Sequence, residues 1–143
     1  MPNLNEFTRR IRARANTLGD NLTKTVRRVA ITADAAVVLG TPVDTGRARS
    51  NWIVALGAPA SQVIEPYSPG EAGSTEGANT QAALAQGESV ITGYVSGQDM
   101  EIHITNNLPY IQRLNDGYSA QAPANFVEMA VMEAVAAARR GVL

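Results

Sequence analysis

Residues 44–46 of this sequence spell Asp-Thr-Gly, the tripeptide that aspartic proteases place at the catalytic carboxylate. These enzymes need two carboxylates that share one proton, so a chain with one such tripeptide would have to act as a homodimer. Here Arg47 and Arg49 follow the tripeptide. A neighbouring guanidinium favours the ionised form of both carboxylates, which is the wrong state for sharing a proton. The neighbouring arginines thus argue against this chemistry, and a homodimeric aspartic protease that uses Asp44 is kept only as an alternative.

The same stretch has the composition of a tight turn. Asp44 can accept hydrogen bonds from the amides of its own turn, and Gly46 can adopt a positive φ. A long predicted helix precedes the stretch and a predicted strand follows it. We therefore expect a structural turn that reverses the chain from helix into strand. Its residues are Pro42, Asp44 and Gly46.

Other residues capable of chemistry are isolated from one another. His103, the single histidine, alternates with Ile102 and Ile104, so it lies on one face of a predicted strand without a second histidine or a cysteine for a metal site. Asp99 and Glu101 share a strand face but lack a third ligand. No glycine-rich loop with a following lysine is present for phosphate binding. We expect no catalytic, cofactor-binding or metal-binding residues, no cofactor, and no enzymatic activity.

Length and composition place these residues in one ordinary globular domain. The chain has 143 residues, of which 45% are hydrophobic and 17% charged, enough for a single core. No apolar run approaches the roughly 20 residues that cross a bilayer, and the N-terminus does not resemble a signal peptide. We expect one domain, 1–143, that folds first in a cytoplasm and contacts no membrane.

The net charge of −1 conceals an asymmetry along the chain. Residues 1–50 hold nine Arg or Lys against four Asp or Glu, whereas residues 51–143 hold three against nine. The basic half could bind nucleic acid, could meet the acidic half of a neighbouring copy, or could form a solvated helix face. Four of these basic residues lie close together near the N-terminus: Arg9, Arg10, Arg12 and Arg14.

A long amphipathic helix must carry these arginines. Leu4, Ile11 and Leu18 recur every seven residues, and a second series formed by Ala15, Leu22, Val29 and Ala36 continues the same stripe. The pattern predicts a helix over about residues 3–39, with a kink at Gly19. Such a helix would be about 55 Å long, at about 1.5 Å per residue, and so longer than a compact domain of this size. Unless it bends, it must project and find a partner.

The remaining pattern predicts an α+β domain with a small antiparallel sheet. Strands are expected at 52–56 and 100–105, a short Ala-rich helix at about 75–89, a short helix from Pro109, and a C-terminal helix at about 123–140 packed on the sheet. Residues 57–74 carry three prolines and three glycines and are too long for an idle connection. We expect them to form an arm that docks on another subunit through Ile64 and Tyr67.

Two stretches together resemble a known family. TPVDTGRARSNW (41–52) and NNLPYIQRLNDGYSAQAPANFVEMAV (106–131) are similar to the tail-completion family of tailed bacteriophages, also called minor tail protein Z, and to the broader head–tail neck proteins. Ile111 and Asn115 depart from the family pattern. The matching residues are Thr41, Pro42, Asp44, Thr45, Gly46, Arg47, Trp52, Asn106, Asn107, Pro109, Tyr110, Leu114, Gly117, Ser119, Ala122 and Pro123.

The resemblance implies a structural role in the virion, with assembly in the bacterial host cytoplasm. Such proteins form a ring at the head–tail junction, complete the tail and leave a channel for genome DNA. The implied partners are copies of the chain itself (a hexamer favoured, a dodecamer possible), a head-side connector protein, and a tail terminator or tail tube protein. A small nucleic-acid-binding protein that uses the basic helix remains a second alternative. The interface candidates are Arg9, Arg10, Arg12, Arg14, Ile64, Tyr67 and Tyr110.

Overall fold

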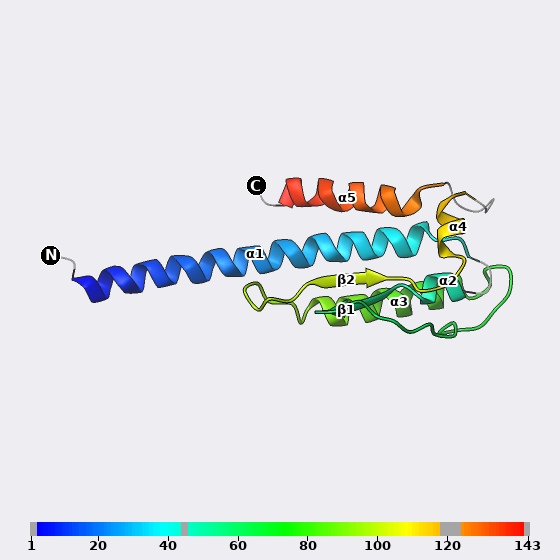
Figure 1. Ribbon diagram of the computed structural model, residues 1–143, viewed down its shortest axis with the longest axis horizontal. Helices are drawn as coiled ribbons and strands as arrows, with labels where there is room; N and C mark the ends of the chain where they lie inside the picture. The colour runs from blue at the N-terminus through cyan, green and yellow to red at the C-terminus, as the bar shows by residue number, and fades with distance from the viewer. Residues whose placement is uncertain (1–2, 44–45, 118–123, 142–143) are drawn as a thin grey trace.

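The computed structural model describes residues 3–43, 46–117 and 124–141, and these residues form layers around one long helix (Figure 1). The C-terminal helix α5 (Phe126–Gly141) lies on one side of α1 (Leu4–Gly40). On the other side of α1 lie a small sheet and helix α3 (Glu76–Ile91). The fold is therefore α+β and mostly helical, and the predicted class is confirmed.

Helix α1 runs without interruption for 37 residues, which confirms the predicted helix. Figure 1 shows no sharp bend along it, so the predicted kink is wrong. Asn3 caps its first turn by accepting a hydrogen bond from the Glu6 amide (2.8 Å). At Gly19, a glycine costs only about 1 kcal/mol of helix stability, which long helical flanks can absorb. In addition, the Ser96 hydroxyl donates to the Gly19 carbonyl (2.8 Å) and accepts from the Thr23 hydroxyl (3.0 Å), which holds this part of the helix.

The sheet consists, in the described residues, of strands β1 (Ile53–Leu56) and β2 (Ile102–Thr105). They pair antiparallel, with Ile53 opposite Thr105 and Leu56 opposite Ile102. Both strands are shorter than predicted, but their positions are confirmed. A two-stranded sheet is marginal by itself, and here α1 and α3 cover it.

Helix α3 faces the core with residues spaced four apart: Asn79, Ala83, Gly87 and Ile91 are all buried. Gly87 allows a close approach to α1, because a Cβ atom there would overlap the Asp34 carboxylate. From the same helix, the Gln86 side chain bonds both the amide (3.0 Å) and the carbonyl (2.9 Å) of Val54 in β1. The Gln86 side-chain amide thus takes the place of a third strand at this edge of the sheet.

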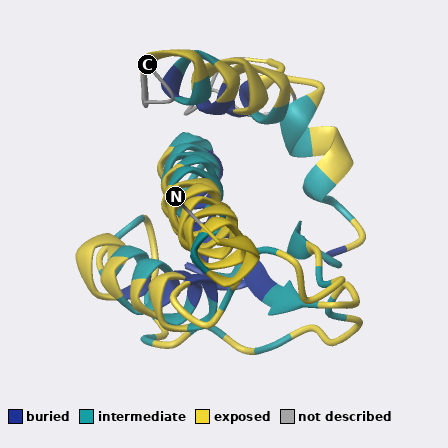
Figure 2. Cartoon of the chain, turned by 90° about the vertical axis from the view of Figure 1, so that its left-hand side faces the viewer, coloured by how far each residue is buried: buried dark blue, intermediate teal, exposed yellow. Residues whose placement is uncertain are grey.

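Two features differ from the sequence-based expectation. A helical turn, α2 (Arg47–Ser50), stands between the turn at Gly46 and β1, so the chain does not pass directly from turn to strand. Helix α5 packs on α1 rather than on the sheet, and α1 lies between them (Figures 1 and 2). The first turns of α5 still reach the main core, where Phe126 and Ala130 join Trp52 and Val38.

Candidate assembly surfaces

The N-terminal half of α1, residues 4–22, extends beyond the rest of the domain; we call it the projecting half (Figure 1). Figure 2 shows it mostly exposed, whereas the C-terminal half of the same helix is largely covered. Its apolar side chains remain in solvent, Leu4 with 81% and Leu18 with 70% of its surface exposed. We call these side chains the apolar stripe: Leu4, Phe7, Ile11, Leu18 and Leu22.

The stripe continues along α1 into the half that is covered. Val29 and Ala36 belong to the same seven-residue series as Leu22. Ala36 packs against the core cluster that contains Phe126 of α5, and Val29 lines a groove beside Ala138 of α5. Helix α5 therefore covers one half of a continuous apolar face and leaves the other half without a partner in this chain's described residues.

The four arginines predicted as interface residues lie on the same projecting half as the apolar stripe, with Arg14 beside the stripe and Arg9 on the opposite side of the helix. Arg9, Arg10, Arg12 and Arg14 are all exposed, as predicted for a solvent-accessible basic surface. Arg10 forms an ion pair with Glu6 (2.8 Å), one turn earlier. An exposed pair of this kind contributes little to stability, so we expect Arg10 to matter little for the fold.

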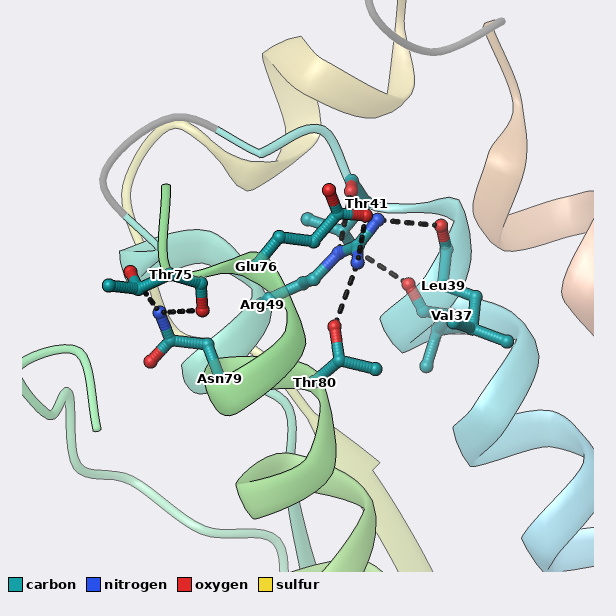
Figure 3. A network of polar contacts seen from close by, with 8 residues as sticks. All are labelled: Val37, Leu39, Thr41, Arg49, Thr75, Glu76, Asn79 and Thr80. Carbon is teal, nitrogen blue, oxygen red and sulfur yellow. Dashed lines mark hydrogen bonds and ion pairs between the residues drawn. The ribbon is translucent and has the colours of Figure 1, made fainter. Parts of the chain in front are cut away.

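At the opposite end of α1, a buried arginine joins α1, α2 and α3 (Figure 3). The Arg49 side chain is 8% exposed and pairs with Glu76 (3.0 Å). It also donates to the Leu39 carbonyl (3.0 Å) and the Thr41 carbonyl (3.1 Å), which are left open where α1 ends. Thr80 accepts a further bond (2.8 Å). Arg49 thus caps α1 and holds α3 against it.

Thr41 and Trp52, two residues of the TPVDTGRARSNW motif, also meet at this junction. The Trp52 indole donates to the Thr41 hydroxyl (2.7 Å), which in turn donates to the Val37 carbonyl (2.6 Å). Gly46 has a φ of +85° and is buried, which confirms the predicted positive φ. A Cβ atom there would overlap the Asn79 side chain. Asp44 lies outside the described residues, and Pro42 is half-buried.

The loop 57–74 is fastened to its own domain by side-chain amides. Asn51 bonds both the amide and the carbonyl of Ile64 (2.8 Å each). Asn79 bonds both the amide and the carbonyl of Ser68 (2.8 Å each). Asn107 donates to the Ala60 carbonyl (2.8 Å). The prediction of an arm that docks on another subunit is therefore wrong in its premise, because three asparagines of the same chain hydrogen-bond to the loop's backbone and hold it on its own domain.

The three other interface candidates lie near this junction rather than near the arginines. Ile64 is half-buried, and Tyr67 is 41% exposed, with its amide donating to the Ser50 hydroxyl (3.3 Å). Tyr110 is half-buried before α4 (Ile111–Asn115), and burial raises its pKa, with the Arg47 charge acting in the opposite direction. The structure thus places the seven candidates in two groups at opposite ends of α1.

A buried carboxyl group in the covered half of α1 was not singled out from the sequence. Asp34 is 2% exposed, and its Oδ1 atom accepts no hydrogen bond within the described residues. Burial raises the pKa of this carboxyl from 3.8 to about 7. Its position four residues after Ala30 and four before Val38, both buried, was the available signal. Asp34 faces Gly87 and can carry a proton near neutral pH.

The described residues offer little for catalysis. No cluster of three His, Asp or Glu side chains that could hold a metal ion occurs among them. His103 Nε2 lies 3.4 Å from a Glu101 carboxylate oxygen, and the two form an isolated pair. An apolar groove of about 570 Å³ lies between α1, β2 and α5, lined by Val29, Ile102 and Ala138 among others. Its lining is mostly apolar, and its titratable side chains are Tyr94 and Glu101.

Comparisons with known proteins found no match to this chain. No protein-family model, no curated protein and no solved structure matches it. Across the residues that the structure describes, no helix is both long enough and apolar enough to cross a membrane.

Proposed function

We propose that this protein is a structural virion protein of a tailed bacteriophage, a ring subunit at the head–tail junction that completes the tail and helps to join it to the capsid. The ring leaves a channel for genome DNA and is assembled in the host cytoplasm. The observation that carries the proposal is the projecting half of α1, whose apolar stripe is exposed in the single chain.

An exposed apolar face of this length favours a protein that is completed by other subunits. Exposed apolar patches that are rimmed by polar residues mark interaction sites. The arginines beside the stripe and the acidic excess in residues 51–143 allow one copy to meet another with opposite charge. A contact between two different patches closes into a ring when the rotation between subunits permits it.

The two alternatives receive less support. For an aspartic protease, the chain supplies one Asp-Thr-Gly tripeptide, and Arg47 and Arg49 follow it in the sequence, where a guanidinium would favour the ionised form of a shared carboxylate pair. For a nucleic-acid-binding protein, the exposed arginines of α1 would contact phosphates, but no groove-reading motif accompanies them. The apolar stripe between those arginines is better suited to protein than to a phosphate backbone.

Electron microscopy of the purified protein in negative stain, together with its mass from light scattering, tests the proposal. We expect closed rings of uniform diameter whose mass is an integral multiple of the subunit mass. Rings should also form when nucleic acid is removed by nuclease. A protein that never forms rings, alone or in lysates that contain the other neck and tail proteins, would contradict it. Pepstatin-sensitive proteolysis that is lost in Asp44→Asn would favour the protease instead.

A further inference from the structure

The two edges of the sheet differ in how their backbone groups are paired. At the edge of β1, the Gln86 side chain bonds both the amide (3.0 Å) and the carbonyl (2.9 Å) of Val54, so these Val54 groups point away from β2. Val54 lies opposite Ile104 in the antiparallel register, and two opposite residues that do not bond each other both point their backbone groups outward. The amide and carbonyl of Ile104 thus point away from β1, and those of Ile102, two residues earlier, do the same.

The outer edge of β2 consists of the amides and carbonyls of Ile102 and Ile104. Across residues 3–43, 46–117 and 124–141, no hydrogen bond reaches any of these groups. The bond from the Gly57 amide to the Glu101 carbonyl (2.8 Å) belongs to the inner edge, as the alternation along the strand requires. A row of open amides and carbonyls at a strand edge is a template for pairing with another strand.

The apolar groove lies beside this outer edge. Ile102 and Ile104 line one side of it, and Val29 and Ala33 of α1 and Ala138 of α5 line the others. Side chains of neighbouring strands that lie directly opposite each other share a face of the sheet. A strand added to β2 would therefore direct every second side chain into the groove. The groove thus offers apolar burial in addition to the hydrogen bonds of the edge.

The charge at the groove favours a basic segment. Among the described residues that line it, the charged one is Glu101, whose side chain is 81% exposed. Asp99, two residues earlier, is also exposed. Basic residues next in sequence to the lining, such as Arg27 and Arg139, are not part of it. A lysine or arginine at the end of an added strand would therefore meet opposite charge beside β2.

We propose that the outer edge of β2, together with the groove, accepts an extended segment of a different protein as a third strand. The segment has apolar side chains at alternate positions and a basic residue beside Glu101, and it binds by strand addition. The strands of this chain, IVAL in β1 and IHIT in β2, contain no lysine or arginine, so a second copy supplies no such strand. The inference goes beyond the proposed ring and does not depend on it.

The probe is a short synthetic peptide in which valine alternates with threonine between a lysine at each end. A control peptide of the same sequence has N-methylated backbone amides, which removes its hydrogen-bond donors and keeps its side chains. Amide exchange of the full chain is measured residue by residue by NMR. In the free protein, the amides of Ile102 and Ile104 should exchange fast, whereas those of His103 and Thr105, which face β1, should exchange slowly.

The alternating peptide, at millimolar concentration, should slow exchange at Ile102 and Ile104 severalfold, and the methylated peptide should not. Glu101→Lys should weaken this effect, because it reverses the charge at the groove. Glu88→Lys, an exposed change on α3, is the matched control and should respond like wild type. An equal response in Glu101→Lys and wild type would overturn the assignment of a basic segment.

Four other results would overturn the strand addition itself. Slow exchange at Ile102 and Ile104 in dilute free protein would show that the edge is closed within its own chain. An alternating peptide without effect would show that the edge accepts no strand. Equal slowing by the methylated peptide would show apolar contact without added backbone bonds. Slowing that follows protein concentration without peptide would show that a second copy occupies the edge.

Discussion

The loop 57–74 and the projecting half of α1 were both expected to contact other subunits, and the structure treats them in opposite ways. The loop carries polar backbone groups, and Asn51 and Asn79 satisfy those of Ile64 and Ser68 inside the same chain. The projecting half satisfies its backbone groups within the helix, but its apolar side chains meet solvent. Apolar side chains that nothing in the chain covers mark an interface more clearly than the length or the glycine content of a loop does.

The difference also separates the roles of the charged residues. Arg49 sits at the junction with nearly all of its donors used, so it serves the fold. Arg12 and Arg14 lie exposed beside the apolar stripe, so they are available to a partner. Substitutions at the junction should therefore change stability, and substitutions on the projecting half should change association.

The largest effect is expected from Arg49→Met. The variant leaves the Leu39 and Thr41 carbonyls without their donor and breaks the pair with Glu76. The free energy of unfolding should fall by about 3–5 kcal/mol, as for other broken buried pairs. Urea denaturation measures it, with Arg12→Met as the matched control, expected to change it by less than about 0.5 kcal/mol. Equal losses of unfolding free energy in the two variants would show that the arginine at the junction stabilises the fold no more than the arginine on the projecting half.

Asp34 should make stability depend on pH in the opposite direction to an ordinary ion-paired aspartate. Its folded pKa, about 7, lies above the unfolded value of 3.8, so the folded chain binds more protons between these values. The contribution is fully present below about pH 4 and is lost as pH rises through 7, with a size of roughly 2–4 kcal/mol.

Denaturation midpoints from pH 5 to 8 test this effect. Asp34→Asn should flatten the profile and raise stability at pH 8, because the amide carries no charge to bury. A wild-type stability that rises across this range in step with that of Asp34→Asn would show that the carboxyl does not titrate there.

Removing one amide clamp should release part of the loop at moderate cost. Asn51→Ala leaves the Ile64 amide and carbonyl without partners and should lower the free energy of unfolding by about 1–3 kcal/mol. Hydrogen exchange at Ile64 should be slow in wild type and fast in the variant. Asn21→Ala, an exposed change on the projecting half, is the control. Fast exchange at both Ile64 and Ser68 in wild type would show that the loop is not held on its own domain, and would favour the predicted arm that docks on another subunit.

The smallest effect on stability is expected on the stripe. Leu18→Gln changes a side chain that is 70% exposed, so the unfolding free energy of the monomer should move by less than about 0.5 kcal/mol. Association should nevertheless weaken. A large loss of monomer stability would mean that the stripe is covered within the chain, which would remove the contrast with the loop.

The sequence predicted the structure well where an apolar pattern repeats along a helix. It predicted poorly where the contacts of a single residue determine the packing. The two seven-residue series, one containing Leu4 and the other Leu22, predicted both the length of α1 and its projection. The same series could not say which part of it α5 would cover, since any apolar helix face fits it. Arg49 and Asp34 looked like surface charges because their partners, Leu39 and Gly87 among them, are brought near only by the fold.

The loop shows the same limit. Its glycines and prolines indicated a long irregular segment, and that part of the prediction was correct. The amide clamps come from Asn51 in the turn after α2 and from Asn79 in α3, 13 and 11 residues away from the groups they bind. No local pattern signals such a pairing. Helix α2, with four residues, is likewise too short to show a helical period.

Thiol labelling tests the central claim most directly, because the chain contains no cysteine. Ile11→Cys places a thiol on the apolar stripe, and Ser61→Cys places one on the exposed part of the loop. Labelling rates are compared between dilute monomer and concentrated, assembled protein. We predict that assembly slows labelling of Ile11→Cys severalfold and leaves Ser61→Cys unchanged. Unchanged labelling of Ile11→Cys in the assembled protein, with Ser61→Cys protected instead, would contradict the account.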